Sequence, residues 1–382
     1  MVEQKRAVII GGGIGGLATA IALLQAGWQV RVFERAPKIE AVGAGLTLWH
    51  NAIKAMDSLG LGEVLLKHSL EGLHGGIMDW RGKLLLKIAD PQQFGIDGPL
   101  MIGLHRADLH AMLAEALPPG VLQTGAQFDR FTQDRNGVMA FFADGHVEQG
   151  DLLIGADGLR SKVRSQLFGF QEPVYSGQAA WRAVIPASAI NLREPVGFEA
   201  WGHGELFGMV PLSKEQIYWF AAVNRPLGSQ DPPEGRKAEL LSIFAGWLDP
   251  VERLIEATPE AKILRNDIFD RDPINAWSSG RVVLLGDAAH PMCPNLGQGA
   301  CQALEDAVVL GQELRRSADL SEALQSYERR RVKRANQILL ASRQMKNLTH
   351  VPYSWACFLR DQTLQILPNR IQTSQIKSVI GV

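Results

Sequence analysis

A glycine-rich turn near the start of the chain, set between an apolar run and a helix-like run, places the strongest constraint on its fold. The apolar run Ala7 to Ile10 passes into Gly11, Gly13 and Gly16, and the helix-like run Leu17 to Ala26 follows. In such a turn the first glycine permits the tight bend, the second lets the backbone approach a pyrophosphate, and the third lets the helix pack closely on the sheet. The free N–H groups at the helix start then suit an anion. The segment predicts a dinucleotide-binding unit, with a chance glycine-rich turn as the alternative.

A second apolar run ends in an acidic residue at the spacing expected for a nucleotide ribose. Trp28 to Phe33 is typical of a strand, and Glu34 follows it directly. A carboxylate at this position accepts hydrogen bonds from both hydroxyls of an adenosine ribose and repels a 2′-phosphate. The site is therefore predicted to take FAD or NAD rather than NADP.

Length and charge set the broad class of the protein. The chain has 382 residues, enough for two packed domains, and its formal net charge is −1. The dense basic run Arg329 to Lys333, with Arg334, lies in a polar helix-like stretch, and we expect it to be a solvated helix face. Nucleic acid is not an expected partner.

Cysteine use and hydropathy indicate a reduced, cytoplasmic protein. Cys293, Cys301 and Cys357 include no CxxC pair, and no histidine stands at metal-ligand spacing. This argues against a disulfide framework and against a metal site. The first apolar run is short and continues into the glycine turn, so no signal peptide is expected. No apolar run reaches the roughly twenty residues that cross a bilayer, although a peripheral membrane contact stays open.

The middle of the chain changes from a nucleotide-binding pattern to alternating, aromatic strands. Mixed turns are expected from Leu73 to Gly98, and a helix from Arg106 to Leu117. A hairpin is expected at Asp144-Gly145 and a buried strand from Asp151 to Ala156. Antiparallel strands then follow at Ala179 to Ile185, Val196 to Trp201, Glu205 to Val210 and Gln216 to Val223. In the last strand, alternation places Tyr218 and Phe220 on one face and Ile217 and Trp219 on the other.

A last apolar strand, Arg281 to Leu285, precedes a loop and a helix from about Gly299, and helices are expected to the end of the chain. The nucleotide sheet is then assembled from three separated segments, with the antiparallel sheet inserted between the second and third. This predicts an α/β fold: a Rossmann-like domain with an inserted antiparallel β-sheet substrate domain and C-terminal helices. The nucleotide-binding domain is expected at residues 1–75, 100–171 and 265–340, the substrate domain at 76–99 and 172–264, and the helical segment at 341–382.

Three motifs occur in order along the chain, and the first is the glycine turn with Glu34. The second is Gly155-Ala156-Asp157-Gly158, followed by Ser161 and Val163-Arg164. The third is Gly286-Asp287-Ala288-Ala289-His290-Pro291, continuing to Pro294, Gly297, Gln298 and Gly299. Together they resemble the nucleotide, DG and GD motifs of the single-component FAD-dependent aromatic hydroxylases, also called group A flavoprotein monooxygenases. The resemblance covers nearly the whole chain.

The resemblance implies FAD as the cofactor and suggests how it is held. Asp287 ends a buried strand at the ligand-binding crevice, so its carboxylate is expected to accept hydrogen bonds from the ribityl hydroxyls. The helix beginning near Gly299 presents its positive dipole end to the reduced flavin. Residues expected to contact the cofactor are Gly11, Gly13, Ile14, Gly15, Gly16, Glu34, Arg35, Gly45, Arg106, Asp157, Asp287, Pro294, Gly297, Gln298, Gly299 and Ala300.

Several of these residues have a purely structural alternative. Asp157 is a candidate cap for a helix from Ser161 to Gln166, and Arg106 a candidate for a surface salt bridge. His290 is expected to support its loop rather than act as a general base. The segment Gly43-Ala44-Gly45-Leu46 resembles the family's loop near the isoalloxazine, but His50 stands where many relatives have proline. The conformation of that loop is left open.

The resemblance also implies the reaction. Gly297-Gln298-Gly299 lacks the third glycine of a second fingerprint, so NADH or NADPH is expected to bind transiently over the flavin. NAD(P)H reduces FAD, O2 forms a C4a-hydroperoxide, and its terminal oxygen passes to an electron-rich substrate. Tyr218 is the catalytic candidate that holds the substrate, with Arg182 behind it. Ordinary strand packing for Tyr218 and a structural ion pair for Arg182 are the alternatives.

The substrate is expected to be a rather apolar aromatic compound. The stretch Trp201 to Phe220 is most similar to hydroxylases of the salicylate and urate type. The urate enzymes place an arginine in the strand where this chain has Glu205-Leu206-Phe207, so Leu206 argues against an anionic purine. An apolar substrate is also favoured by the large side chains Trp181, Trp201, Phe207, Met209 and Trp219, for which core packing is the equal alternative.

Three functions stay open. An aromatic hydroxylase acting on a small molecule and O2 is expected first. The second is an epoxidase of an isoprenoid that docks on membranes through the apolar residues Trp355, Phe358, Leu359, Leu364 and Ile366, although we expect these residues rather to pack inside the protein. The third is an FAD-binding reductase or binding subunit without oxygen transfer, against which the intact Glu34, Asp157 and Asp287 argue. A monomer and a homodimer are both open.

Overall fold

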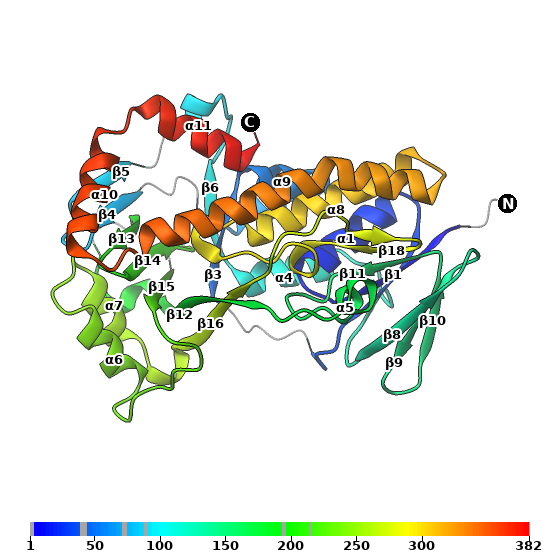
Figure 1. Cartoon of the computed structure of the whole chain (residues 1–382), viewed down its shortest axis with the longest axis horizontal. Helices are drawn as coiled ribbons and strands as arrows, with labels where there is room; N and C mark the ends of the chain where they lie inside the picture. The colour runs from blue at the N-terminus through cyan, green and yellow to red at the C-terminus, as the bar shows by residue number, and fades with distance from the viewer. Residues whose placement is uncertain are drawn as a thin grey trace.

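The structure is a computed structural model that describes residues 4–38, 44–70, 75–87, 91–192, 196–213 and 215–381. Gly43, in the loop expected near the isoalloxazine, lies outside the described residues. Figure 1 shows an elongated molecule with a large sheet at one end and a small hairpin sheet at the other, joined along its length by the long helix α9 (Leu320–Thr349).

A mainly parallel sheet is built from three distant parts of the sequence. Its described strands are ordered β17-β18-β11-β1-β2-β7. The strands are β1 (Arg6–Ile10), β2 (Gln29–Phe33), β7 (Leu122–Gln123), β11 (Leu152–Gly155), β17 (Ser278–Ser279) and β18 (Val282–Leu284). All neighbours pair in parallel except β17, which is antiparallel to β18. The predicted assembly from three segments is confirmed.

Helices cover this sheet and share its hydrophobic core. They are α1 (Ile14–Gln25), α2 (His50–Ser58), α3 (Gly62–Lys67), α4 (Arg106–Glu115), α5 (Lys162–Phe168) and α8 (Gly299–Arg316). Helices α1 and α8 pack closely, because a Cβ on Gly311 would lie 2.8 Å from the Cβ of Ala22. A core of buried residues joins β1, β11 and β18 to these helices.

Two small antiparallel sheets flank the parallel one. The described strands β8 (Phe128–Gln133), β9 (Val138–Phe142) and β10 (Val147–Gly150) form one, with the predicted turn at Asp144-Gly145 between β9 and β10. Strands β3 (Gly45–Trp49) and β6 (Met101–His105) form the other. The second pair leads into α2 and α4, so it joins the nucleotide-binding half to the large sheet.

The large sheet orders its described strands as β16-β12-β15-β14-β13-β4-β5. They are β4 (Gly75–Asp79), β5 (Leu84–Lys87), β12 (Val174–Pro186), β13 (Gly197–Trp201), β14 (Glu205–Pro211), β15 (Gln216–Asn224) and β16 (Leu264–Asp270). The four predicted antiparallel strands are confirmed. The expectation of turns from Leu73 to Gly98 is wrong for β4 and β5. Gly75 and Gly76 hide the apolar alternation there, and Gly75 lets β4 approach β13 closely, since its Cβ would lie 1.7 Å from the carbonyl oxygen of Gly197.

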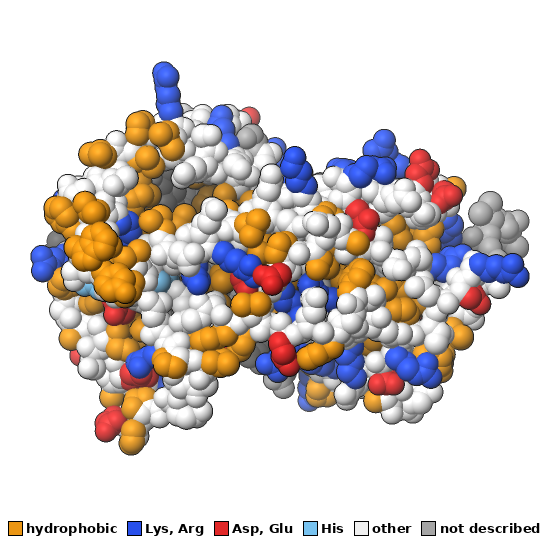
Figure 2. Space-filling view, viewed as in Figure 1, with side chains coloured by type: hydrophobic (Ala, Val, Ile, Leu, Met, Phe, Trp, Pro, Cys, Tyr) orange, Lys and Arg blue, Asp and Glu red, His pale blue; other side chains and the backbone are white. Residues whose placement is uncertain are grey.

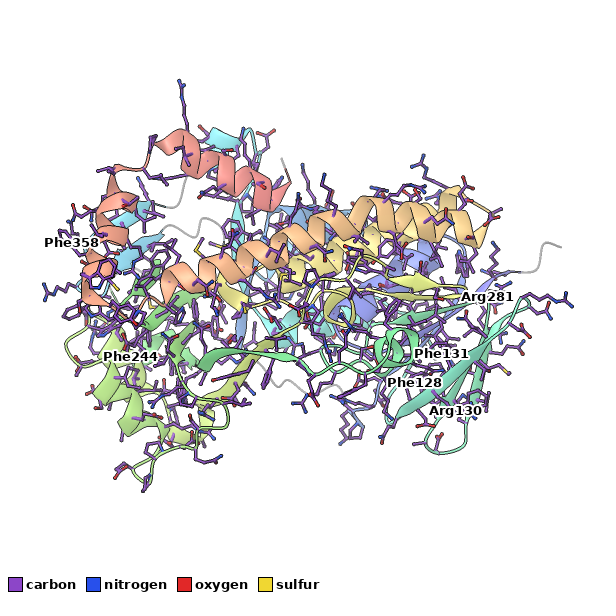
Figure 3. The ribbon with its side chains drawn as sticks, viewed as in Figure 1. Phe128, Arg130, Phe131, Phe244, Arg281 and Phe358 are labelled. Carbon is purple, nitrogen blue, oxygen red and sulfur yellow. The ribbon has the colours of Figure 1, made fainter. Side chains whose placement is uncertain are left out.

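One face of the large sheet packs on α6 (Arg236–Ile243) and α7 (Val251–Ala257), forming a second core. Phe207 stacks on Trp219 with ring centres 5.5 Å apart, and Phe244, labelled in Figure 3, meets Phe207 edge-on. Trp181 and Met209 belong to the same core. Trp181, Phe207, Met209 and Trp219 therefore pack inside the protein, as the core-packing alternative expects, and their use as evidence for an apolar substrate is wrong. Trp201, the fifth residue of that set, lies on the other face of the sheet.

From Gly299 onward the described chain is helical, as predicted, and it ends in α10 (Ser354–Ile366) and α11 (Asn369–Ile380). The basic run in α9 is not uniformly solvated as expected, because Arg331 is buried. The helical period directs this residue inward, where it pairs with acids on α8. The expectation that the apolar residues of α10 pack inside holds for Leu364 but is wrong for Trp355, Phe358, Leu359 and Ile366, which are exposed.

The three cysteines are buried and unpaired. Within the described part of the chain, no helix is long and apolar enough to cross a membrane.

Candidate functional site

The three sequence motifs meet at the carboxyl ends of the parallel strands. The glycine turn follows β1, Glu34 follows β2, Asp157 lies two residues after β11, and Asp287 follows β18. Because parallel strands place their carboxyl ends at one edge, residues that are far apart in sequence converge there. This edge is the candidate site.

The glycine turn contains two packing glycines and one open glycine. A Cβ on Gly11, whose φ is 108°, would lie 2.3 Å from the carbonyl oxygen of Ala156, and one on Gly16 would lie 2.0 Å from that of Gly11. Gly15 packs toward Leu285, and the Ile14 side chain lies in the core, so only the backbones of these two residues are available to a ligand. A Cβ on Gly13 would meet nothing within 4 Å. The open space at the start of α1 lies where a pyrophosphate was predicted.

Glu34 closes the turn on its other side. Its carboxylate accepts hydrogen bonds from the backbone N–H groups of Gly12 at 2.7 Å and Ala36 at 2.8 Å. Arg35 is exposed beside it. His110 on α4 also reaches the turn, with its Nε2 2.5 Å from the carbonyl oxygen of Gly12, a contact that no motif in the sequence indicates. The predicted ribose contact of Glu34 stays a prediction.

Asp157 caps α5. Its carboxylate accepts hydrogen bonds from the Ser161 hydroxyl at 2.5 Å and from the Lys162 N–H at 2.7 Å. Burial raises the pKa of Asp157, and these hydrogen bonds oppose the shift. Asp157 therefore has the helix-capping role that was the structural alternative to a cofactor contact. The helix that it caps positions Arg164, which donates to the carbonyl oxygen of Ala289 at 2.9 Å and so joins the second motif to the third.

Asp287 lies at the carboxyl end of β18. Its side chain is exposed, yet the surrounding protein raises its pKa by desolvation, with His290 and Arg106 opposing the shift. Arg106 is also exposed, at the first turn of α4. No salt bridge of Arg106 is present among the described residues, so the surface salt-bridge alternative finds no partner there. Arg106 thus acts electrostatically on Asp287 without forming a salt bridge with it among the described residues.

The loop after β18 leads to the start of α8. Pro294 begins a 3-10 turn, and Gly297 is left-handed at φ 61°, with its Cα facing Thr47 and Trp49 of β3. Space is open around Gly299, the first residue of α8, and Ala300 packs partly on the core.

A buried polar network supports this loop from below. His290 Nε2 lies 2.6 Å from Asp306, which also accepts from the Gly286 N–H at 2.9 Å and from Arg331 at 2.7 Å. Burial alone would raise the pKa of Asp306, but His290 and Arg331 lower it to about 2. His290 is thus engaged with the loop rather than open to a substrate. Sequence reasoning missed Asp306 and Arg331, although the helical register of both was an available signal.

The network continues to the first turn of α8. Asn51 of α2 donates to Gln298 at 3.0 Å and to Glu305 at 2.5 Å, and Gln302 also donates to Gln298. The side-chain nitrogen of Gln298 is buried and finds no hydrogen-bond partner in the described part of the chain. His50 is the first residue of α2, a position that also suits proline. The backbone there is helical with histidine in the place where many relatives have proline.

The large sheet contributes Tyr218 to the site. A Cβ on Gly45 would lie 2.4 Å from the Tyr218 ring, so this glycine lets β3 and β15 approach each other. Its predicted contact with the cofactor stays a prediction. Tyr218 stacks on Phe220 with ring centres 5.5 Å apart, and no hydrogen bond to its hydroxyl is present among the described residues. Burial raises the pKa of Tyr218 to about 12, with Arg182 opposing, so the hydroxyl is neutral at physiological pH.

Arg182 shares the Tyr218 face of the sheet. It lies opposite Phe220 in the register and donates to Asn266 at 2.6 Å. No ion pair of Arg182 is present in the described residues. The structural ion pair that was its alternative role is therefore not formed there, and Arg182 instead bonds the neutral side chain of Asn266.

The arrangement fits an FAD molecule. Open space lies at two helix starts, Gly13 and Gly299, where backbone N–H groups and positive dipole ends suit a pyrophosphate and an anionic ring. Among the described residues, the Asp287 carboxylate and the Gln298 amide nitrogen have no hydrogen-bond partner. Over the described residues, no group of three or more His, Cys, Asp or Glu side chains is arranged for a metal ion.

Comparison with known proteins gives a consistent result. A family model described as FAD binding domain matches residues 4–342. The chain is 42% identical to aurachin C monooxygenase/isomerase of Stigmatella aurantiaca, covering 94% of each protein. It is 35% identical to 6-hydroxynicotinate 3-monooxygenase of Bordetella bronchiseptica, covering 88% of this chain and 90% of that protein. The crystal structure of Klebsiella pneumoniae HpxO complexed with FAD and uric acid superposes with a TM-score of 0.90 at 31% identity, covering 98% of this chain and 96% of that one.

Proposed function

Because this chain belongs to the family of FAD-dependent group A flavoprotein monooxygenases, we propose that it hydroxylates a neutral aromatic or heteroaromatic compound at the face of the large sheet that carries Tyr218. The single observation that carries this choice is the Tyr218 hydroxyl at the junction of β3 and β15, which is neutral and has no hydrogen-bond partner among the described residues. A hydroxyl in this state both donates and accepts a hydrogen bond. It suits a substrate hydroxyl, carbonyl or ring nitrogen.

The surrounding residues favour a neutral compound. Leu206 is buried on the same side of the sheet, with Trp201 and Phe220, and Arg182 is already engaged by Asn266. A carboxylate or a urate anion would have no free cation from these residues. The names of the relatives support a heteroaromatic ring, since they refer to hydroxynicotinate, urate and aurachin C.

The chain's own residues would bind and orient the reactants. Bound FAD supplies the redox and oxygen-transfer chemistry, with NADH or NADPH as the reductant. The glycine turn and Glu34 would hold the adenosine half, Asp287 and Arg106 the ribityl chain, and the start of α8 the ring. Tyr218 would orient the substrate, and the stacked ring of Phe220 would exclude water from it.

The test follows NAD(P)H consumption, oxygen uptake and peroxide together in the purified yellow protein, across phenols, benzoates, quinolones and indoles. The proposal expects one compound to accelerate oxidation strongly with little peroxide. Tyr218→Phe should keep FAD and lower kcat/KM for that compound by about 2-fold to 12-fold, because one hydrogen bond between neutral groups is lost. Oxidation that ends only as peroxide with every compound would reject the proposal, and turnover only with a partner protein would favour the reductase alternative.

A second candidate, epoxidation of an isoprenoid at a membrane, is favoured by the outer face of α10. Trp355 is 68% exposed, Phe358 63%, Leu359 55% and Ile366 79%, and their spacing places them on one side of the helix. Figure 2 shows hydrophobic side chains gathered over α10, and Figure 3 labels Phe358 at the outer edge of the molecule.

The charged residues of α10 do not interrupt this face. Arg360 donates to Asp361 at 2.8 Å and to the carbonyl oxygen of Thr349 at 3.3 Å, so both are turned toward the protein. Arg370 and Lys377 of α11 add positive charge, and no acidic residue lies on α11. An uncharged aromatic face beside cations suits an anionic lipid surface.

Sedimentation with vesicles of phosphatidylcholine and phosphatidylserine tests this contact. The wild-type protein should sediment with the vesicles and Trp355→Ser/Phe358→Ser should not, whereas Glu256→Ala on α7 should behave as wild type. If light scattering shows that the wild type is a dimer and the double variant a monomer, the face binds a second copy of the chain instead. If the double variant behaves as wild type in both measurements, the epoxidase candidate loses its support.

A further inference from the structure

A carboxylate on the substrate side of the large sheet has no role in the function proposed above. Glu199 lies on β13 between Phe198 and Ala200, both of which point into the core with α6 and α7. Alternation therefore directs Glu199 to the opposite face, together with Trp201. That face carries Tyr218 and Phe220.

The register places Glu199 in one row with residues of the candidate site. Glu199 is opposite Gly208, Gly208 is opposite Phe220, and Phe220 is opposite Arg182. Directly opposed residues point to the same face, and neighbouring strands are about 4.8 Å apart. Gly208 has no side chain, and a Cβ there would lie 2.1 Å from the Phe220 ring. The Phe220 ring thus extends over Gly208 toward Glu199.

The Glu199 carboxylate is poorly compensated by the protein. Among the described residues it accepts one hydrogen bond, from the indole N–H of Trp201 at 2.6 Å, and forms no ion pair. A carboxylate has about four acceptor positions. Burial raises the pKa of Glu199 to about 7, and the Trp201 hydrogen bond opposes the shift. Glu199 nevertheless keeps partial access to solvent, unlike its buried neighbours Phe198 and Ala200.

We propose that Glu199 is a substrate-binding residue that accepts a hydrogen bond from an N–H or O–H group of the aromatic substrate. The inference rests on the hydroxylase function proposed above and narrows its substrate class to neutral rings that carry such a donor. A site with a buried acceptor rejects an analogue that lacks the donor far more strongly than an apolar pocket does, because its polar group is then left unpaired.

Other ionisable groups on the neighbouring elements do not replace Glu199 in this role. Tyr218 of β15 and Arg182 of β12 lie across the sheet, and Asp79 of β4 is engaged by the N–H groups of Arg81 and Lys83. Arg360 of α10 lies over the Trp201 ring, 5.3 Å from its centre, and donates to Asp361.

The experiment compares matched ligands in the FAD-loaded protein. 4-Quinolone carries an N–H donor and 1-methyl-4-quinolone lacks it, and phenol with anisole forms a second matched pair. Binding is measured from the change in flavin absorbance and from the acceleration of NAD(P)H oxidation. At about pH 8.5, where Glu199 is ionised because its pKa is about 7, wild type should prefer the donor compound of a pair by about 10-fold to 100-fold, the range for a hydrogen bond to a charged group.

Glu199→Leu should abolish that preference while FAD content stays at the wild-type level, and Glu199→Gln, which keeps a carbonyl acceptor, should retain part of it. The matched control Glu256→Gln on exposed α7 should leave the preference unchanged. An unchanged preference in Glu199→Leu overturns the inference and leaves the hydroxylase function standing. If no compound binds or accelerates oxidation in wild type, the hydroxylase function fails and the inference fails with it.

Discussion

Two aspartates about twenty residues apart show how the fold assigns opposite states to the same side chain. Asp287 is exposed and has no hydrogen-bond partner among the described residues, and desolvation raises its pKa. Asp306 is fully buried but touches His290 and Arg331, which lower its pKa to about 2. The first carboxylate is therefore available to a ligand, and the second stabilises the loop that presents the first.

Replacing Asp287 should weaken cofactor binding without unfolding the protein. Asp287→Ala removes the predicted acceptor of the ribityl hydroxyls, and loss of hydrogen bonds to a charged group costs about 1.5–3 kcal/mol. FAD affinity should fall by about 10-fold to 150-fold, measured as the ratio of flavin to protein absorbance after gel filtration. Glu256→Ala serves as the control. Full retention of the yellow colour by Asp287→Ala would reject the assignment.

Replacing Asp306 should destabilise the protein in a pH-dependent way. Asp306→Asn leaves the buried Arg331 with a weaker partner, and breaking such a pair costs about 3 kcal/mol at pH 7. The folded pKa of about 2 lies below the ordinary value of 3.8, so the charged pair's stabilisation is complete above about pH 4 and is lost as the pH falls toward 2. Urea unfolding of both proteins should show a gap that is smaller at pH 3 than at pH 7. A gap independent of pH would contradict this account.

At the scale of elements, the site is made by two helix starts directed at one sheet edge. Helix α1 begins after the glycine turn, and α8 begins after the loop that follows β18. The two helices pack directly on each other through Ala22 and Gly311, which fixes the relation between their N-termini. Packing of the helices thus determines the spacing between the predicted pyrophosphate site and the predicted ring site.

Two glycines at the start of α1 should respond differently to alanine. Gly16→Ala places a Cβ 2.0 Å from a backbone oxygen that has no freedom to move, and we expect loss of more than about 3 kcal/mol or failure to fold. Gly13→Ala meets open space and should fold normally, but should bind FAD at least about 10-fold more weakly if a pyrophosphate occupies that space. Circular dichroism and flavin content distinguish the two results. Normal flavin content in Gly13→Ala would remove the pyrophosphate from this position.

At the scale of the whole molecule, α9 joins the core of the parallel sheet to the large sheet. It contributes Tyr327 and Ala335 to that core. Farther along, Arg343 donates to both oxygens of the buried Asp270 on β16, at 2.6 Å and 2.9 Å, and its pKa is raised by that contact. The site at the junction of β3 and β15 depends on both halves being held in place.

Breaking this connection should loosen one half relative to the other. Arg343→Met leaves Asp270 buried without its ion pair, which costs about 3–5 kcal/mol, and should broaden or split the calorimetric unfolding transition. Arg343→Met/Asp270→Asn should recover part of the loss, because no uncompensated charge is left. Equal stability of the single variant and wild type would show that the ion pair does not couple the halves.

Local patterns in the sequence were sufficient for the order of motifs, the three-segment parallel sheet, the four antiparallel strands and the family. These follow from strand alternation, glycine turns and acids at strand ends, which depend on residues close together in the chain. Gly13, Asp287 and Gln298 could be singled out for the same reason, and their contacts with FAD stay predictions.

Only the tertiary structure decided which face of each element is covered. Alternation separated Tyr218 from Trp219, but the packing of α6 and α7 decided that Trp219 is core and that Tyr218 borders the site. In the same way, α8 buries Arg331, and nothing among the described residues covers the outer side of Trp355. Burial depends on contacts between distant segments, so the local pattern of a single chain leaves it undetermined.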